Sequence, residues 1–372
     1  MIGGSWWNAL RFGYFTLRRG PHVGRDFLMS TNRRFCNASD KILGWSRGYP
    51  SYYLLSPTLW SRPSMNGLTT RLMSLYQWRK LPDLISLAVA DTCNAHCEFC
   101  SFTAMVKTGV TPLATVEWKR VIGQAQDLGC TTLNFVGGEP LLREDLPELI
   151  RFVDPDLSQS ILFSNGFHLA DRARELQRAG LTSVIVALDA ALPAAHDRRK
   201  GLSGLFPRAL QGIEAARREK LLVGLSVVVR PEDLESGDLL QVFELGRELK
   251  VNELLLFDAV GPTAQWTPER LESLIELAAA THRRPGYPGV HAYAYSKSAR
   301  GLGCSGGVSH FYVSPYGEVC PCDFNPDSMG NVRETPLHVL WDRFHERGYA
   351  QSSLSGCRCQ PRTAPEGARQ EA

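Results

Sequence analysis

Three closely spaced cysteines provide the clearest chemistry in this sequence. Cys93, Cys97 and Cys100 follow the pattern C-x3-C-x2-C, directly after an apolar run at 84–90 that predicts a β-strand. A tetrahedral zinc site needs four ligands, whereas an iron–sulfur cluster takes one cysteine for each iron. Three thiolates therefore predict a four-iron cubane that leaves one iron open to a ligand from outside the protein.

A second group of cysteines lies near the C-terminus: Cys304, Cys320, Cys322, Cys357 and Cys359. In a reducing compartment, clustered cysteines favour metal binding over disulfides. The group could hold a further iron–sulfur cluster, and the alternative is a structural zinc ion bound by four of the five. The two remaining cysteines, Cys36 and Cys130, stand alone, and we expect both to be ordinary small core residues.

Composition limits the class of protein. The chain has 372 residues, of which 44% are hydrophobic and 21% charged, as is typical of a folded soluble protein. No apolar run reaches the length needed to cross a bilayer, and the N-terminus lacks the features of a signal peptide. We therefore expect a cytoplasmic protein.

Residues 1–82 differ from the rest of the chain. The first 80 residues contain 12 Lys and Arg against 2 Asp and Glu, and five of the eight tryptophans. Segments 6–17 and 68–78 show helical patterns. We favour an extension that packs its aromatic side chains on the main domain. Peripheral membrane contact is the next interpretation, and no motif suggests nucleic-acid binding.

From residue 83 the sequence alternates between strand and helix patterns. Strands are predicted at 85–90, 132–136, 160–163, 183–188, 221–229 and 253–257, and helices at 114–128, 144–153, 169–179, 206–219, 238–249 and 268–279. Alternation of this kind predicts a parallel sheet with right-handed crossovers. Six units do not close an eight-stranded barrel, so the predicted fold is α/β, a partial (β/α)6 barrel.

Distinctive residues follow the first four predicted strands. The cysteine loop follows the first, Gly137-Gly138-Glu139-Pro140 the second, Ser164-Asn165 the third, and Asp189 the fourth. The carboxyl ends of parallel strands meet at one edge of a sheet, where ligands bind. The sequence therefore predicts one site that all four segments share.

The motif C-x3-C-x-aromatic-C followed by GGEP resembles the radical S-adenosylmethionine (SAM) superfamily over roughly residues 83–260. The resemblance implies that Cys93, Cys97 and Cys100 bind a [4Fe–4S] cluster and that SAM chelates the open iron. It implies further SAM contacts: Phe99 against the adenine, Gly137, Gly138, Glu139 and Pro140 accepting from the amino group, and Ser164, Asn165 and Asp189 at the ribose or methionine part.

Two positions leave alternatives open. Relatives often carry Ser-Leu-Asp where this chain has Ala187-Leu188-Asp189, so either a SAM contact is missing or Ser164 supplies it. The adjacent cations Arg199 and Lys200 could clamp a carboxylate, but we expect a solvated pair beside a helix.

The C-terminal cysteines resemble the auxiliary-cluster region called SPASM, or Twitch in its shorter form. Three features support the resemblance: the spacing C-x12-G-x4-C from Cys304 to Cys322, a Gly330-Asn331 turn, and a predicted helix at 337–344 with Trp341. A hairpin turn is predicted at Tyr316-Gly317. The resemblance implies one auxiliary [4Fe–4S] cluster on Cys304, Cys322 and either Cys357 or Cys359, with Cys320 a fourth ligand or a bystander.

The predicted organisation is a basic extension (1–82), a barrel (83–300), a small cysteine-rich hairpin and helix domain (301–360) and a disordered tail (361–372). The resemblance implies that a one-electron donor such as flavodoxin or ferredoxin reduces the cluster. Cleavage of SAM then yields a 5′-deoxyadenosyl radical that abstracts a substrate hydrogen. We rank a peptide substrate first, then a sugar-like and then a lipid-linked molecule. The alternative is a non-catalytic zinc-binding or scaffold protein. No general acid or base is marked by spacing.

Overall fold

The structure is a computed structural model that describes residues 41–77, 81–260, 265–296, 298, 301 and 303–349. In these residues nine strands form one sheet, in the order β11-β10-β3-β4-β5-β6-β7-β8-β9. Their bounds are β3 (Leu84–Ala90), β4 (Thr132–Gly137), β5 (Gln159–Ser164), β6 (Ser183–Ala187), β7 (Leu222–Val229), β8 (Glu253–Asp258), β9 (Gly289–Ala292), β10 (His310–Val313) and β11 (Val319–Cys320). A separate hairpin joins β1 (Gly44–Ser46) to β2 (Tyr49–Ser51).

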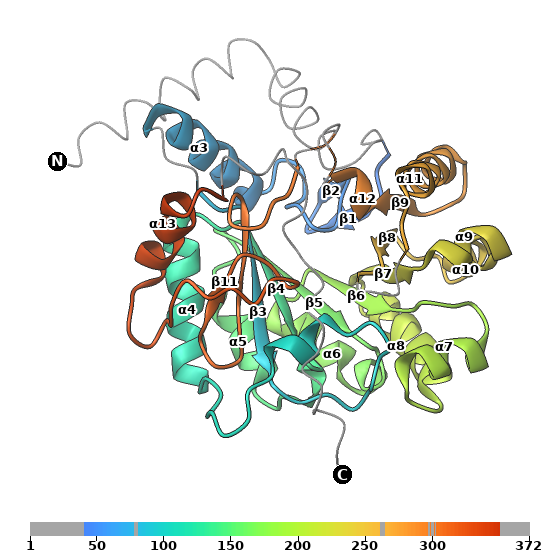
Figure 1. Ribbon diagram of the computed structural model, residues 1–372, viewed down its shortest axis with the longest axis horizontal. Helices are drawn as coiled ribbons and strands as arrows, with labels where there is room; N and C mark the ends of the chain where they lie inside the picture. Colours follow the sequence, from blue (N-terminus) through green and yellow to red (C-terminus); the bar gives the residue numbers. More distant parts are fainter. Residues whose placement is uncertain are drawn as a thin grey trace.

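The helices of the described residues are α3 (Arg62–Gln77), α4 (Thr115–Leu128), α5 (Leu146–Phe152), α6 (Leu169–Ala179), α7 (Pro193–Lys200), α8 (Leu205–Arg218), α9 (Pro231–Ser236), α10 (Asp238–Glu248), α11 (Pro268–Arg283), α12 (Tyr293–Ser296) and α13 (Leu337–Glu346). Helices α4, α5, α6 and α8 cover the outer side of the sheet (Figure 1). Short 3-10 turns lie at η1 (Ser101–Met105) and η2 (Pro140–Leu142).

The predicted fold class is confirmed. Each neighbouring pair from β3 to β9 is parallel, and an α-helix lies between most consecutive strands. The main core fills the space between the outer face of the sheet and the helices, with Trp118 and Phe243 among its buried side chains. Because the sheet is covered on that side and curves around a second interior on the other, its strands have near-continuous apolar sequences.

The C-terminal hairpin extends this sheet. Strand β10 pairs in parallel with β3 and antiparallel with β11. The predicted turn at Tyr316-Gly317 is present, with Gly317 at a φ of 92°, a conformation that favours glycine. Trp341 of α13 is fully buried and packs on Phe311, with ring centroids 5.2 Å apart.

Sequence patterns missed β9, α7 and α9. Strand β9 has only four residues and includes a histidine, so its apolar pattern is short. Helices α7 and α9 are rich in charge, but each has a proline in its first turn and a glycine at its C-terminal end, Gly201 and Gly237. That pairing of proline and glycine is the signal that could have identified both helices.

Residues 52–57 close the bottom of the barrel. Leu54 is 2% exposed and packs in a small core with Ile161 and Ile185. Its backbone N–H donates to Glu253 at 2.8 Å, and its carbonyl accepts from Gln159 at 3.2 Å. This part of the basic segment thus packs on the barrel.

Other predictions for residues 1–82 have different outcomes. The side chain of Trp45 is 60% exposed, and helix α3 begins earlier than the pattern at 68–78 indicated. The predicted helix at 6–17 lies outside the described residues. No helix in the described part of the chain has the length and apolar character needed to cross a membrane.

Candidate functional site

The cysteine loop follows β3 at the carboxyl edge of the sheet. No disulfide joins Cys93, Cys97 and Cys100. Burial is the main reason why the pKa of Cys97 is raised to about 11; the Lys200 ammonium opposes this rise, and the neighbouring Cys100 and Cys93 add to it. Metal binding requires the thiolate and so releases the proton of such a thiol. In the described residues no three His, Cys, Asp or Glu side chains are grouped closely enough to hold a single ion, but a cubane needs only one thiolate for each iron.

Helix α7 holds the cysteine loop through its backbone. The N–H groups of His96 and Glu98 donate to the carbonyls of Lys200 and Arg199 at 2.9 and 3.0 Å. Gly201 ends the helix at a φ of 59°, and a Cβ there would lie 2.5 Å from the carbonyl oxygen of His96. The loop and the helix end are therefore in close backbone contact that only glycine permits.

The glycines after β4 lie equally close to the loop. A Cβ on Gly138 would lie 2.0 Å from the carbonyl oxygen of Thr92, and Gly137 has a φ of 132°. The N–H of Glu139 donates to the same carbonyl at 2.8 Å. Two glycines are therefore needed to bring the end of β4 against the start of the cysteine loop.

The side chain of Glu139 connects neighbouring strand ends. It is 1% exposed and accepts from the Ser164 hydroxyl and the Asn165 N–H, both at 2.8 Å. The Asn165 side chain donates in turn to Asn94 of the cysteine loop at 2.8 Å. Burial raises the pKa of Glu139 despite these hydrogen bonds. The predicted site residues after β4 and β5 are thus joined to each other and to the loop.

Asp189 forms a buried ion pair with Lys200. Its Oδ2 lies 2.7 Å from the Lys200 ammonium, and the two side chains are 8% and 6% exposed. Its Oδ1 accepts from the N–H of Val228 at 3.0 Å. The expectation of a solvated Arg199 and Lys200 pair was wrong. Helix α7 turns both side chains inward, where Asp189 and Asp233 neutralise them.

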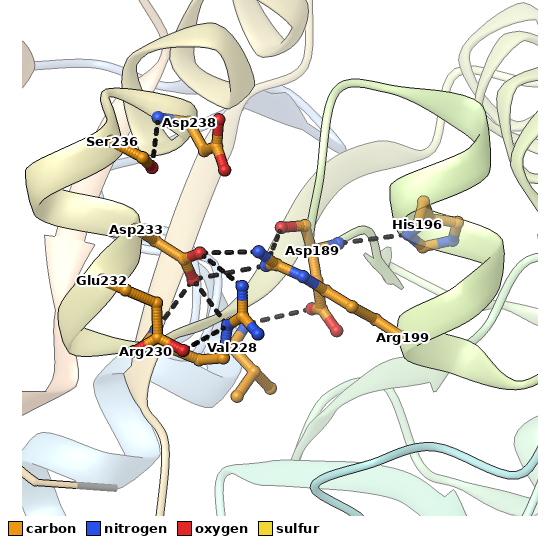
Figure 2. A network of polar contacts seen from close by, with 9 residues as sticks. All are labelled: Asp189, His196, Arg199, Val228, Arg230, Glu232, Asp233, Ser236 and Asp238. Carbon is orange, nitrogen blue, oxygen red and sulfur yellow. Dashed lines mark hydrogen bonds and ion pairs between the residues drawn. The ribbon is translucent and has the colours of Figure 1, made fainter.

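A network of hydrogen bonds and ion pairs around Arg199 supports this arrangement (Figure 2). Asp233 of α9 accepts from Arg199 at 2.6 Å and from Arg230 at 3.0 Å. Arg199 also donates to the carbonyl of Asp189 at 2.8 Å, and the N–H of Asp189 donates to His196 at 3.3 Å. The network connects the ends of β6 and β7 with α7 and α9, and through α7 it positions the cysteine loop.

A cavity of about 330 Å³ lies inside the curved sheet. Phe99 and Gly137 line it at the carboxyl edge, and Tyr53 and residues 55–57 line the opposite end. Most of its wall is apolar or aromatic, with the side chains of Phe102, Val136, Phe163, Phe257 and Tyr293. The space can therefore enclose an apolar group beside the carboxyl edge of the barrel.

A cluster of polar side chains lies on one wall of the cavity. The hydroxyl of Ser86 donates to Asp323 at 3.2 Å and lies 3.1 Å from Nε2 of His310. His310 and Asp323 are themselves 3.1 Å apart. His310 belongs to β10 and Asp323 follows Cys322, so this cluster brings the C-terminal region into the wall of the barrel.

The described C-terminal cysteines fall in two environments. Cys320 is 1% exposed and packs in an apolar cluster with Ala88, Met105 and Tyr312. The loop after Cys304 lies against Cys322, because a Cβ on Gly306 would be 3.4 Å from the Cys322 Cβ. Cys357 and Cys359, and the tail at 361–372, lie outside the described residues.

Known proteins share this arrangement. Residues 87–242 match the model of the radical SAM superfamily, and residues 304–360 match that of the SPASM iron–sulfur cluster-binding domain. An AdoMet-dependent heme synthase of Methanosarcina barkeri is 30% identical over 290 residues, which are 70% of this chain and 82% of the relative. The chain belongs to the radical SAM superfamily and carries a SPASM domain.

Other similar proteins include a PqqA peptide cyclase of Rhizobium meliloti, 29% identical over 71% of this chain and 74% of its own length. Among solved structures, Streptococcus suis SuiB bound to precursor peptide SuiA has a TM-score of 0.60 at 14% identity, over 77% of this chain and 71% of that one. This last likeness shows the fold alone. The family assignment makes the protein a radical SAM enzyme and decides against the zinc-binding scaffold.

The family brings a [4Fe–4S] cluster, SAM and an iron–sulfur cluster in the SPASM domain. The described residues fit these groups. Three thiols without disulfides are present in one loop, and glycine backbone lies beside them at the cavity. Phe99 and Gly137 line the cavity, as do Ala187 and Lys200.

Several residues of the site were not predicted. They are Ser86, Asn134, His310, Tyr312 and Asp323, all of which line the cavity. Ser86 and Asn134 interrupt otherwise apolar strands, as does Ser226 in β7. A polar residue inside an apolar strand is the signal that could have indicated the inner face of the barrel.

Proposed function

We propose that this radical SAM enzyme removes a hydrogen atom from a residue of a peptide or protein and that the product is oxidised or crosslinked. The observation that carries the proposal is the apolar cavity of about 330 Å³ between the cysteine loop and residues 53–57. Pockets of about 300–1,000 Å³ enclose small ligands, and this one has room for a side chain. The name of one relative, PqqA peptide cyclase, supports a peptide substrate.

Charge favours a peptide over a porphyrin. Relatives named heme synthase and Fe-coproporphyrin III synthase make a porphyrin the second candidate. Coproporphyrin carries several carboxylates, which require cations in the site. The described cavity wall instead contains Asp83, Asp258 and Asp323, against Lys200, and Lys200 is already paired with Asp189.

The residues of this chain have distinct proposed roles. Cys93, Cys97 and Cys100 hold the [4Fe–4S] cluster, which with SAM supplies a 5′-deoxyadenosyl radical. The backbone at Gly137 and Gly138 approaches the SAM amino group, and Phe99 packs on the adenine. Pro140 and Glu139 keep this segment in place, because Glu139 accepts hydrogen bonds from the end of β5.

Three polar residues at strand ends remain candidates for the ribose and methionine part of SAM: Ser164, Asn165 and Asp189. Their hydrogen bonds to Glu139, Asn94 and Val228 hold them at the carboxyl edge of the sheet. Residues 53–57 close the far end of the cavity and so exclude water from a reactive radical.

Cys304, Cys322 and one of Cys357 and Cys359 are the proposed ligands of a single auxiliary cluster, which would accept the second electron of an oxidation. Cys320 is favoured as a structural residue, because it packs among apolar side chains. A flavodoxin or ferredoxin is the proposed electron donor, and the proposed location is the cytoplasm; peripheral membrane contact through residues 1–82 is the second interpretation of that segment.

Deuterium transfer tests the substrate class and does not require a purified substrate. Source cells are grown in deuterated water and fractionated into peptides and proteins, polar small molecules, lipids and porphyrins. Each fraction is incubated with the anaerobically reconstituted enzyme, SAM in ordinary water and a chemical reductant. We expect deuterium in 5′-deoxyadenosine, measured by mass spectrometry, from the peptide and protein fraction. Transfer from another fraction only would contradict the proposal and identify the correct class.

A further inference from the structure

Three polar side chains lie in a row across the inner face of the sheet. The strand register pairs Tyr312 of β10 with Ser86 of β3, and Ser86 with Asn134 of β4. Adjacent strands are about 4.8 Å apart. A substrate group next to Ser86 is therefore about one strand spacing from Tyr312 on one side and from Asn134 on the other. All three side chains line the cavity. We call Tyr312, Ser86 and Asn134 the polar row.

The sequence neighbours of the polar row are apolar and face the other way. Phe311, Leu87 and Phe135 belong to the main core under the helices and are fully buried. Side chains alternate between the two faces of a strand. The three polar residues therefore point into the barrel at one level. They take no part in the core that lies between the sheet and the helices.

Two atoms of the polar row are buried without a hydrogen-bond partner among the described residues: the hydroxyl of Tyr312 and Oδ1 of Asn134. The two residues are 3% and 5% exposed. An unpaired buried polar atom destabilises the folded protein, and buried polar groups are partnered in the large majority of cases. Ser86 differs, because His310 and Asp323 satisfy its hydroxyl.

We propose that the polar row binds the end of the substrate side chain that enters the cavity, and that this side chain has an apolar body and a neutral hydrogen-bonding end. The inference rests on the proposed function and specifies its substrate class. A phenol remains protonated at neutral pH, so Tyr312 donates, and Asn134 accepts. A hydroxyl, a phenol or a carboxamide can both accept and donate, and so satisfies both atoms.

The surroundings of the polar row disfavour other ends, and a cationic end has no acceptor for the Tyr312 hydroxyl. The carboxylate of Asp323 lies beside Ser86 and would repel a substrate carboxylate. An aliphatic or phenyl side chain would leave the atoms of Tyr312 and Asn134 unpaired. The aromatic walls at Phe102 and Phe163 match an apolar body between the reacting carbon and the polar end.

Labelling single amino-acid types tests this inference. Source cells are fed one deuterated amino acid at a time, and their peptide and protein fraction is incubated with the enzyme, SAM and reductant. We expect deuterium in 5′-deoxyadenosine from tyrosine or glutamine, whose side chains have an apolar body before a neutral polar end. Transfer only from other amino acids, such as phenylalanine, leucine, serine or a charged residue, overturns the inference and leaves the proposed function intact. Transfer from no amino acid contradicts both the proposed function and the inference.

Two substitutions test the polar row itself. Tyr312→Phe and Asn134→Leu should each lower deuterium transfer about tenfold at a limiting amount of labelled fraction, the effect of one lost hydrogen bond. The loss should largely recover at a saturating amount. The matched control is Tyr316→Phe, since Tyr316 is on the same hairpin, is 2% exposed and bonds Lys107 outside the cavity.

Stability separates this binding role from a structural one. Tyr312→Phe removes a buried hydroxyl that has no described partner, so urea unfolding should show an unchanged or higher stability. Full transfer by Tyr312→Phe at limiting substrate, or an equal loss in Tyr316→Phe, would overturn the assignment of the polar row.

Discussion

Asp233 is the shared carboxylate of the network in Figure 2, and its replacement should loosen the cysteine loop. Its oxygens accept from Arg199 at 2.6 Å and from Arg230 at 3.0 Å, and its side chain is 5% exposed. Asp233→Ala leaves the guanidinium of Arg199, 10% exposed, without its carboxylate. Removing one member of a buried ion pair costs about 3–5 kcal/mol, a large part of the roughly 5–15 kcal/mol that is typical of a folded protein.

The effect should reach the cluster site, because the carbonyl of Arg199 accepts the N–H of Glu98 in the cysteine loop at 3.0 Å. We therefore expect Asp233→Ala to unfold at lower urea and to lose iron to a chelator faster. The matched control is Glu235→Ala in the same helix. Glu235 pairs with Arg270, but these side chains are 62% and 39% exposed, and such a pair contributes about 0–1 kcal/mol.

The pH dependence adds a second check on Asp233. Burial alone would raise its pKa, but hydrogen bonds from Arg230 and Arg199 outweigh burial and hold the pKa below its ordinary value. Its stabilisation is therefore present above the unfolded pKa, about 3.9, and is lost as pH falls through the folded pKa. Equal losses of stability in Asp233→Ala and Glu235→Ala at pH 7 would refute the reasoning.

Four further substitutions have defined outcomes. Burial, with a smaller effect of Lys200, lowers the pKa of His196 to about 4. The free energy of unfolding should therefore fall by about 3 kcal/mol between pH 6.5 and pH 4. In urea titrations, His196→Asn should abolish this dependence of stability on pH. Gly138→Ala should stop formation of 5′-deoxyadenosine, because its Cβ would lie 2.0 Å from a backbone oxygen of the cysteine loop's first turn, whereas Gly123→Ala, with open space around it, should raise stability by about 0.5–1 kcal/mol. Leu54→Ala should cost about 3–5 kcal/mol in urea unfolding, because Leu54 is 2% exposed at the bottom of the barrel.

Each of these expectations can fail. A parallel pH slope in wild type and His196→Asn would show that His196 is not the group that titrates. Full activity in Gly138→Ala would show that the loop has room to move. A loss below about 0.5 kcal/mol for Leu54→Ala, the range of a surface change, would show that residues 52–57 do not seal the barrel.

The sequence predicted the barrel because each of its elements is locally encoded. Apolar strands alternate with helices such as α6, which ends at Gly180 as its pattern indicated. The site segments were also visible, since cysteines and paired glycines stand out at strand ends. The pairing of strands that are distant in sequence could not be read from the sequence. The pairing of β10 with β3, which brings His310 and Tyr312 into the cavity wall, depends on contacts between residues more than 200 positions apart.

Burial of charge was the other feature that local patterns could not give. Arg199 and Lys200 stand in a charged helix without an apolar face, and such helices are usually solvated. Their partners, Asp233 and Asp189, come from other β/α units, so only the assembled barrel shows that the cations are neutralised inside it.

The central claim is that Cys93, Cys97 and Cys100 hold a cluster with one iron open to SAM. The most direct test measures 5′-deoxyadenosine formed from SAM by the anaerobically reconstituted and reduced enzyme and by the variant with all three cysteines replaced by Ala. The variant should form none, while about four irons remain in the C-terminal region. Formation of 5′-deoxyadenosine by the variant at the wild-type rate would contradict the claim.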